Sequence, residues 1–183
     1  EFLPGALEYF AKNINKHNDT SFIFAPFYTS RCGNKKLACK YQEGVVENPY
    51  KEHFFGRILP RTGAFVCTRE LCLKEPFDEN IRRFEDLEWL YRIYKHTIIY
   101  KVSKPVLTTN IDFSAASRAR KDIKEDFLGH FDFKGKSFWE KMALYALYLG
   151  ERNYYPEQCR KLYPGLHRRY DWLLLYKLIH FLK

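Results

Sequence analysis

The sequence predicts an α/β protein in which a mixed sheet is followed by a helical C-terminal extension. Up to about residue 110, short β-branched and aromatic runs alternate with amphipathic segments, whereas only helical patterns follow residue 137. Apolar residues make up 46% of the 183-residue chain and aromatic residues 18%, which is enough to form a core. The chain has no Gly-rich phosphate loop and no opening βαβ unit, so any nucleotide-binding half of such a fold is expected upstream of residue 1.

The first predicted element is an amphipathic helix over residues 3–17, with Pro4 in its first turn. Apolar residues recur in it at the spacing i, i+3, i+4, i+7. The stripe expected to face the core therefore consists of Leu7, Phe10, Ala11 and Ile14.

A strand, a turn and a second strand follow. Residues 21–30 are typical of a buried strand, with Pro26 near its end or at a sheet edge. Residues 31–36 indicate a hairpin turn, because Gly and Asn tolerate positive φ. Residues 37–46 are then expected to pair back as the second strand.

The next segment predicts a short helix over residues 48–60, with Asn48 as its N-cap and Pro49 at its first position. A strand over residues 64–68 comes after it, directly preceded by Gly63. A glycine there permits close approach of a ligand, and it equally suits an ordinary turn.

A polar loop over residues 75–84 leads into a helix over residues 85–96. One face of this helix is apolar and is formed by Leu87, Leu90, Tyr91 and Tyr94. The β-branched content of residues 97–109 predicts one further strand.

The remainder is a polar, charged loop over residues 111–136 and then helices. Ser137 and Glu140 form a capping-box pattern at the start of a helix over residues 137–152. Two further helices are expected over residues 155–164 and 166–183. The last one is apolar on most sides, which suits packing on its own domain or contact with an anionic membrane surface.

The overall charge favours an anionic partner, since the chain contains 31 Lys and Arg but only 22 Asp and Glu, which gives a net charge of +9. Five cysteines without a CxxC pair argue against a zinc ribbon and against a disulfide framework, so reduced thiols in a cytosolic protein are expected. No segment has the pattern of a membrane span or signal peptide. The first residue is not Met, which suggests a piece of a longer protein.

Three carboxylates, Glu85, Asp86 and Glu88, open the helix over residues 85–96. Acidic residues in a first turn stabilise a helix by about 0.3–1 kcal/mol each, which is a sufficient reason for their presence. A carboxylate kept ionised at a helix N-terminus is also suited to accept a proton as a general base. The residues alone leave both interpretations open.

Three stretches resemble one enzyme family. "EFLPGALEYF" (residues 1–10) resembles the segment that follows a metal-binding Asp-x-Asp motif, and "RTGAFVCTREL" (residues 61–71) the strand before an acceptor site. "PFDENIRRFEDLEWLYRI" (residues 76–93) resembles the pattern GxFDExxxxxEDxxxxxR, with Glu75 and Pro76 in place of the usual Gly. Residues 1–110 thus resemble the second half of an inverting family 2 glycosyltransferase of the GT-A fold.

The resemblance implies transfer of a sugar from a nucleotide-diphosphate donor to a saccharide or lipid-linked acceptor. It implies Asp86 and Glu85 as the catalytic residues, with Asp86 as the general base and Glu85 beside it holding the helix start or the acceptor. It also implies acceptor contacts at Thr62, Gly63 and Glu88. The missing Gln-x-x-Arg-Trp motif indicates transfer of a single sugar. A divalent metal, Mn or Mg, is expected on an Asp-x-Asp upstream of Glu1, so this chain alone is expected to be inactive and to bind no metal.

Further expectations follow from the same resemblance. Residues 1–110 would be the acceptor side of a GT-A domain, residues 111–136 an active-site loop, and residues 137–183 a helical extension. In that loop, Ser117, Arg118 and Arg120 are expected to contact the diphosphate. The alternative is that these residues belong to an ordinary solvated loop without a function in binding. The implied role is hexosyl transfer in cell-surface polysaccharide or lipopolysaccharide biosynthesis, in the cytoplasm or peripherally at the inner face of the membrane.

Two other classes compete with this interpretation. A basic nucleic-acid-binding module would use the charge and the aromatic side chains. It is disfavoured because the aromatics lie in periodic segments and the basic residues are spread along the chain. A non-catalytic, partner-binding remnant is the other alternative. Arg92 lies six residues after Asp86 on the same helix and is expected to point away from it. It is expected either to form a salt bridge or to have a functional role.

Overall fold

The architecture comes from a computed structural model, which describes the backbone of residues 1–17, 20–31, 33–59, 61–81, 84–110 and 135–154. Side chains are described up to residue 149. Of the predicted elements, the helices over residues 155–164 and 166–183 lie outside these ranges, as does nearly all of the loop over residues 111–136.

The strands form two mixed sheets. The larger has the strand order β4 (Gly44–Val45), β6 (Ile99–Lys101), β1 (Phe22–Phe24), β5 (Phe65–Cys67). In it β1 runs parallel to β6 and antiparallel to β5, and β4 is antiparallel to β6. The smaller has the order β3 (Asn34–Leu37), β2 (Phe27–Arg31), β7 (Leu107–Asn110), with β2 parallel to β7. The predicted mixed α/β class is confirmed.

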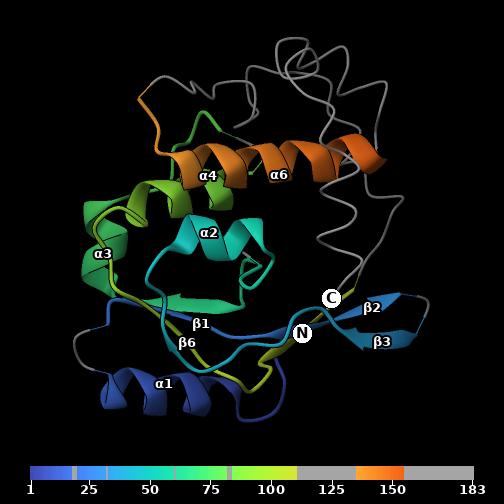
Figure 1. The fold of residues 1–183 in the computed structure, drawn as a ribbon. Helices are drawn as coiled ribbons and strands as arrows, with labels where there is room; N and C mark the ends of the chain where they lie inside the picture. Colours follow the sequence, from blue (N-terminus) through green and yellow to red (C-terminus); the bar gives the residue numbers. More distant parts are fainter. Residues whose placement is uncertain (18–19, 32, 60, 82–83, 111–134, 155–183) are drawn as a thin grey trace.

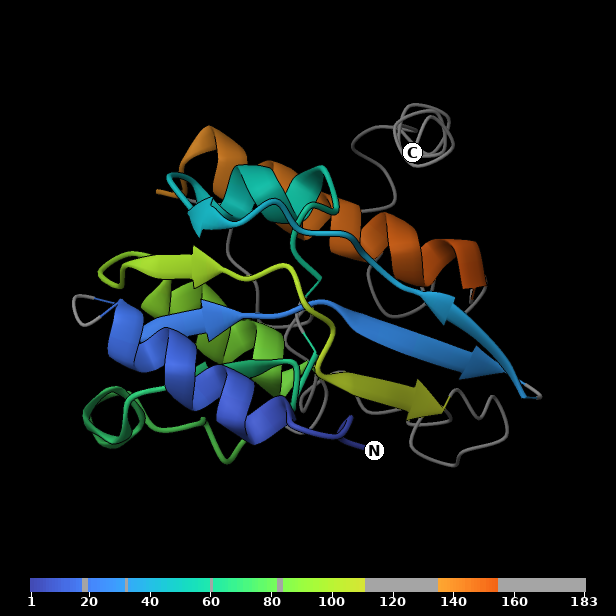
Figure 2. The ribbon, with the colours of Figure 1, turned by 90° about the horizontal axis from the view of Figure 1, so that it is seen from below.

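Two chain segments pass side by side through both sheets, as Figure 2 shows for β1 and β2 next to β6 and β7. The predictions of one strand over residues 21–30 and one over 97–109 were therefore wrong, because each segment is broken into two strands. Pro26 and Pro105 lie in the breaks, where the missing N–H removes a ladder bond. Backbone bonds across the breaks, such as Val106 N–H to Pro26 O at 3.1 Å, keep the segments together.

The hairpin turn predicted over residues 31–36 is confirmed, since Arg31 pairs with Asn34 and Gly33 has φ of 81°. Its second strand was misplaced. The returning strand β3 ends at Leu37, because the ladder closes directly after the tight turn. Within the predicted range 37–46, only Gly44 and Val45 form a strand, and they pair with β6 in the other sheet.

Helices cover both sides of the larger sheet (Figure 1). Helix α1 (Ala6–Lys16) lies on one side, and the other carries α2 (Pro49–Phe54), α4 (Glu85–Ile93) and α6 (Phe138–Tyr154). A short helix that the sequence analysis missed, α3 (Arg69–Lys74), follows β5. Two predicted caps are confirmed: Asn48 Oδ1 accepts from Lys51 N at 2.9 Å, and Ser137 Oγ accepts from Glu140 N at 3.3 Å.

Helix α1 differs in detail from the prediction. Gly5 is its N-cap with φ of 72°, so Pro4 precedes the helix and does not lie in its first turn. The buried positions are Ala6, Phe10 and Asn13, whereas Leu7 is 66% exposed and Ala11 is also exposed. Asn13 can be buried because its side-chain amide donates to Tyr9 O at 2.9 Å.

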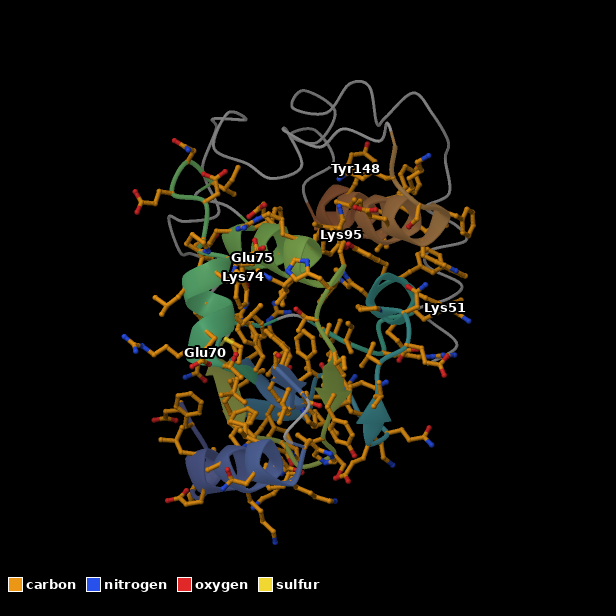
Figure 3. All side chains as sticks on the ribbon, turned by 90° about the vertical axis from the view of Figure 1, so that its left-hand side faces the viewer. Lys51, Glu70, Lys74, Glu75, Lys95 and Tyr148 are labelled. Carbon is orange, nitrogen blue, oxygen red and sulfur yellow. The ribbon has the colours of Figure 1, made fainter. Side chains whose placement is uncertain are left out.

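Helix α4 joins the sheet to the other helices. All four predicted core positions on it, Leu87, Leu90, Tyr91 and Tyr94, are buried, as are Trp89 and Ile93. Its apolar face meets the fully buried strand β1 through the Phe22–Trp89 ring contact. Lys95 just beyond α4 reaches Glu140 of α6 at 3.6 Å, and Figure 3 shows Lys95 between these two helices. Helix α4 is thus held by the sheet on one side and by α6 on the other.

Candidate functional site

Asp86 and Thr62 meet at the start of α4. The hydroxyl of Thr62 donates to Asp86 Oδ2 at 3.0 Å, although the two residues are 24 positions apart. Asp86 Oδ1 accepts from the backbone N–H of Leu87 at 2.9 Å. The carboxylate of Asp86, half-exposed, is therefore held at both oxygens while solvent still reaches the residue.

Gly63 fixes the backbone next to Thr62. Its φ of 90° lies in the left-handed region that L side chains rarely adopt. A Cβ at this position would lie 3.1 Å from Cδ2 of Leu107, the first residue of β7. The conformation therefore favours glycine, and a Cβ would fit only if the Leu107 side chain shifted by a few tenths of an ångström.

Helix α4 begins with an unusual backbone. Phe84, the N-cap, has φ of 59° and makes no side-chain capping bond. A left-handed conformation of a non-glycine residue costs about 1–2 kcal/mol. Glu85, Asp86 and Glu88 are all in the first turn, where their charge complements the helix dipole. The helix start therefore depends on these carboxylates and not on a polar N-cap side chain, which agrees with the structural interpretation of the acidic cluster.

Glu88 is bound by Arg92. Nε and Nη2 of Arg92 donate to the two carboxylate oxygens of Glu88 at 2.6 and 3.0 Å. Nη1 of Arg92 also reaches Glu75 at 3.1 Å, and Nη2 reaches Pro76 O at 2.7 Å. The hydrogen bond to Glu88, more than the other influences, raises the pKa of Arg92.

These contacts separate Glu88 from the other predicted site residues. Glu88 lies about 200° around the helix from Asp86, because successive helical residues are about 100° apart. The structure thus brings together Asp86, Thr62 and Gly63, with the exposed Glu85 beside Asp86. Both oxygens of Glu88 are instead engaged by Arg92, so the contacts of Arg92 support its interpretation as a salt-bridge partner.

Sequence reasoning missed how the segment after α3 is anchored to α4. The indole N–H of Trp89 donates to the backbone carbonyl of Glu75. The Phe77 ring stacks on Trp89 at a centroid distance of 4.9 Å and an interplanar angle of 17°. Figure 3 shows Glu75 beside α4. The only signal of this contact in the sequence was the presence of Trp89 in an amphipathic helix. The indole N–H of a buried Trp needs an acceptor, but the sequence does not show which group supplies it.

The part of the chain that the structure describes does not contain the implied divalent-metal site. Across the described ranges, no group of three or more His, Cys, Asp or Glu is placed to hold a metal ion. The predicted diphosphate contacts at Ser117, Arg118 and Arg120 lie outside the described residues.

Comparison with known proteins adds no family. No protein-family model, curated protein or solved structure matches this chain. Among the helices in the described part of the chain, none has the length and apolar character needed to cross a membrane.

Proposed function

We propose that this chain is the acceptor-side part of an inverting, non-processive glycosyltransferase of the GT-A fold and family 2. It would transfer one sugar from a nucleotide-diphosphate donor to a saccharide or lipid-linked acceptor. The observation that supports this most is the Thr62–Asp86 hydrogen bond, which orients a half-exposed carboxylate at a helix start. A general base needs this combination of access and fixed orientation.

In the proposed step, the acceptor hydroxyl oxygen attacks the anomeric carbon and the bond to the nucleotide diphosphate breaks. The hydroxyl proton passes to the Asp86 carboxylate as the new bond forms. Each carboxylate oxygen has two lone pairs, so the contacts from Thr62 and Leu87 leave capacity for that proton. Thr62 is a positioning residue here, because it acts on the reaction through Asp86.

The rest of the proposal concerns groups outside the described residues. Arg118 and Arg120 suit the diphosphate as bidentate donors, with Ser117 as a further donor. A divalent metal on the Asp-x-Asp expected upstream of Glu1 would stabilise the leaving diphosphate. The acceptor would belong to cell-surface polysaccharide or lipopolysaccharide biosynthesis at the inner face of the membrane.

The test measures sugar transfer by a polypeptide that extends upstream of Glu1 to include the proposed nucleotide half. Asp86→Asn should lower kcat by at least about 100-fold, the lower range for loss of a general base. The free energy of unfolding should fall by no more than about 1 kcal/mol, the contribution of one first-turn charge. Glu8→Gln is the matched control, since Glu8 is likewise a carboxylate in the first turn of a helix, is exposed and lies outside the site. Normal turnover by Asp86→Asn would exclude Asp86 as the base.

Isothermal titration separates this function from the nucleic-acid alternative. UDP- and GDP-sugars with manganese should bind the extended polypeptide, and single-stranded DNA should not. Binding of the DNA without any nucleotide-sugar binding would favour the basic module instead.

A further inference from the structure

Cys67 and Cys72 form a close thiol pair at the junction of β5 and α3. Their sulfur atoms are 3.1 Å apart. Cys67 is the last residue of β5, and Thr68, the N-cap of α3, accepts from Leu71 N at 3.3 Å. Cys67 thus lies just before the cap and Cys72 four residues after it, the two positions whose side chains pack across a helix start. The local fold therefore brings the two sulfurs together.

The two thiols differ in their surroundings. Cys72 is exposed, whereas Cys67 is half-buried. Burial, with a smaller contribution from Cys72, raises the pKa of Cys67 to about 12. Cys72 is therefore the sulfur that a reagent in solution can reach first, and Cys67 is the sulfur positioned to react second.

We propose that Cys67 and Cys72 are a reversible modification site at which a small disulfide oxidant, such as oxidised glutathione, closes an intramolecular disulfide. The thiolate of Cys72 attacks one glutathione sulfur, which forms a mixed disulfide and releases one glutathione thiolate. The sulfur of Cys67 then attacks Cys72, loses its proton, and releases the second glutathione. The two cysteines lose two hydrogens, and one oxidised glutathione becomes two reduced ones.

The geometry needs only a small adjustment for this step. A disulfide has an S–S length of about 2.0 Å, so the sulfurs must approach by about 1 Å. Rotation of the exposed Cys72 side chain is the natural source of this movement, because Cys67 is fixed in a strand that pairs with β1. The bond would tie β5 to α3, the helix that ends next to Glu75.

The experiment equilibrates the folded protein with defined ratios of oxidised to reduced glutathione, followed by acid quench, alkylation and trypsin digestion. Trypsin cuts after Arg69, between the two cysteines, so the disulfide links peptide 62–69 to peptide 70–74. We expect a linked peptide whose mass is the sum of both minus two hydrogens. It should be missing in Cys72→Ser and Cys67→Ser and present in the control variants Cys32→Ser and Cys159→Ser.

A parallel equilibration in concentrated urea tests whether the fold holds the sulfurs together. The equilibrium constant for disulfide formation should be at least about tenfold larger in the folded protein, a reduction potential about 30 mV more negative. Equal constants in buffer and urea would overturn the proposal. So would a glutathione adduct on Cys72 that never gives way to the linked peptide, or a disulfide joining either cysteine to another one. The comparison of buffer with urea and the identification of adducts and disulfides are made on the unmutated chain, so these results do not depend on whether the Ser variants fold.

Discussion

Thr62 and Asp86 are joined by a 3.0 Å hydrogen bond that connects the turn before β5 to the first turn of α4. The bond restricts the rotation of an acidic side chain that is otherwise half-exposed. Loss of the hydroxyl should therefore affect the orientation of the carboxylate far more than the stability of the fold.

Thr62→Val should lower kcat for sugar transfer by roughly 10- to 100-fold in the extended polypeptide, because small misplacements of a catalytic group are costly. The free energy of unfolding should change by no more than about 1 kcal/mol, since the lost bond is exposed. Thr62→Ser keeps the hydroxyl and should restore most of kcat. If Thr62→Ser is as slow as Thr62→Val, the positioning role is wrong.

Gly63→Ala should destabilise the protein by more than the same change at Gly135. Both glycines have positive φ, 90° and 74°, so both substitutions introduce about 1–2 kcal/mol of backbone strain. At Gly63 the new Cβ also meets the buried Leu107, whereas it has open space at Gly135. Urea denaturation should show an additional loss of about 1 kcal/mol at Gly63. Equal losses would show that Leu107 moves aside freely.

Trp89→Phe should lower the free energy of unfolding by about 1–3 kcal/mol, because it leaves the carbonyl of Glu75 without its indole donor. The matched control is Trp139→Phe, which makes the same change where a half-buried indole packs on Phe54 and Phe55. Chemical denaturation of both variants gives the comparison. A smaller loss at Trp89 than at Trp139 would contradict the anchoring role of this hydrogen bond.

Arg92→Lys should cost about 1 kcal/mol of stability, because an ammonium cannot reproduce the two-pronged contact with Glu88 while also reaching Glu75 and Pro76. The expected loss of stability is small because the side chain of Arg92 is 35% exposed and solvent screens its charge. Arg57→Lys is the control, since Arg57 is 58% exposed and makes one 3.3 Å ion pair, with Glu52. Its other interaction, over the Phe55 ring at 5.1 Å, is one that a lysine can also make. Thermal unfolding should show almost no change for Arg57→Lys.

Glu52 should make stability depend on acidity. Burial alone would raise its pKa, but hydrogen bonds and charge from Lys101 and Arg57 outweigh burial, so the pKa lies below its ordinary 4.5. A carboxyl whose pKa is lowered by folding stabilises the protein above its unfolded pKa and loses this contribution as pH falls through the folded value. Lys101 and Glu52 are mostly buried and 2.6 Å apart, so the contact is substantial.

The melting temperature of the wild-type protein should fall as the pH is lowered from 7 to below about 4.5, and Glu52→Gln should make this fall smaller. At pH 7 the variant should lose about 2 kcal/mol of stability, because Lys101 keeps its charge without a carboxylate. Glu47→Gln, the same change at an exposed position, should follow the wild-type acid profile. An unchanged profile for Glu52→Gln would contradict the expected linkage.

Local signals in the sequence were sufficient where a helix start is defined by nearby residues. Asn48 with Pro49, and Ser137 three residues before Glu140, predicted the starts of α2 and α6 correctly because capping bonds span only three residues. The same logic could have found α3, since Thr68 caps it, Glu70 lies in its first turn and Lys74 in its last.

Other features depend on partners far away in the chain. Pro26 is a local signal for the break, but no local signal shows that the strand before it pairs with β6 and the strand after it pairs with β7 in another sheet. In α1, the sequence favoured Leu7 and Ala11, but the sheet's position determined which face is buried.

At the site, the Glu88–Arg92 contact has the i, i+4 spacing of a helical ion pair and could have been predicted. Its extension to Glu75 across the loop could not, because it depends on how that loop folds back onto α4. The meeting of Thr62 with Asp86 depends on tertiary structure in the same way.

The side-by-side course of residues 22–31 and 99–110 has a consequence for how the protein reaches its native state. Phe22 pairs with Ile99 and Thr29 with Thr109, so the parallel ladders of both sheets join parts of the chain that are synthesised far apart in time. Contacts between such distant segments are entropically costly to close, which slows folding. On the ribosome, β1 can pair with β5 before it can pair with β6, so the parallel edge of this apolar strand has no partner strand until residues 99–110 emerge.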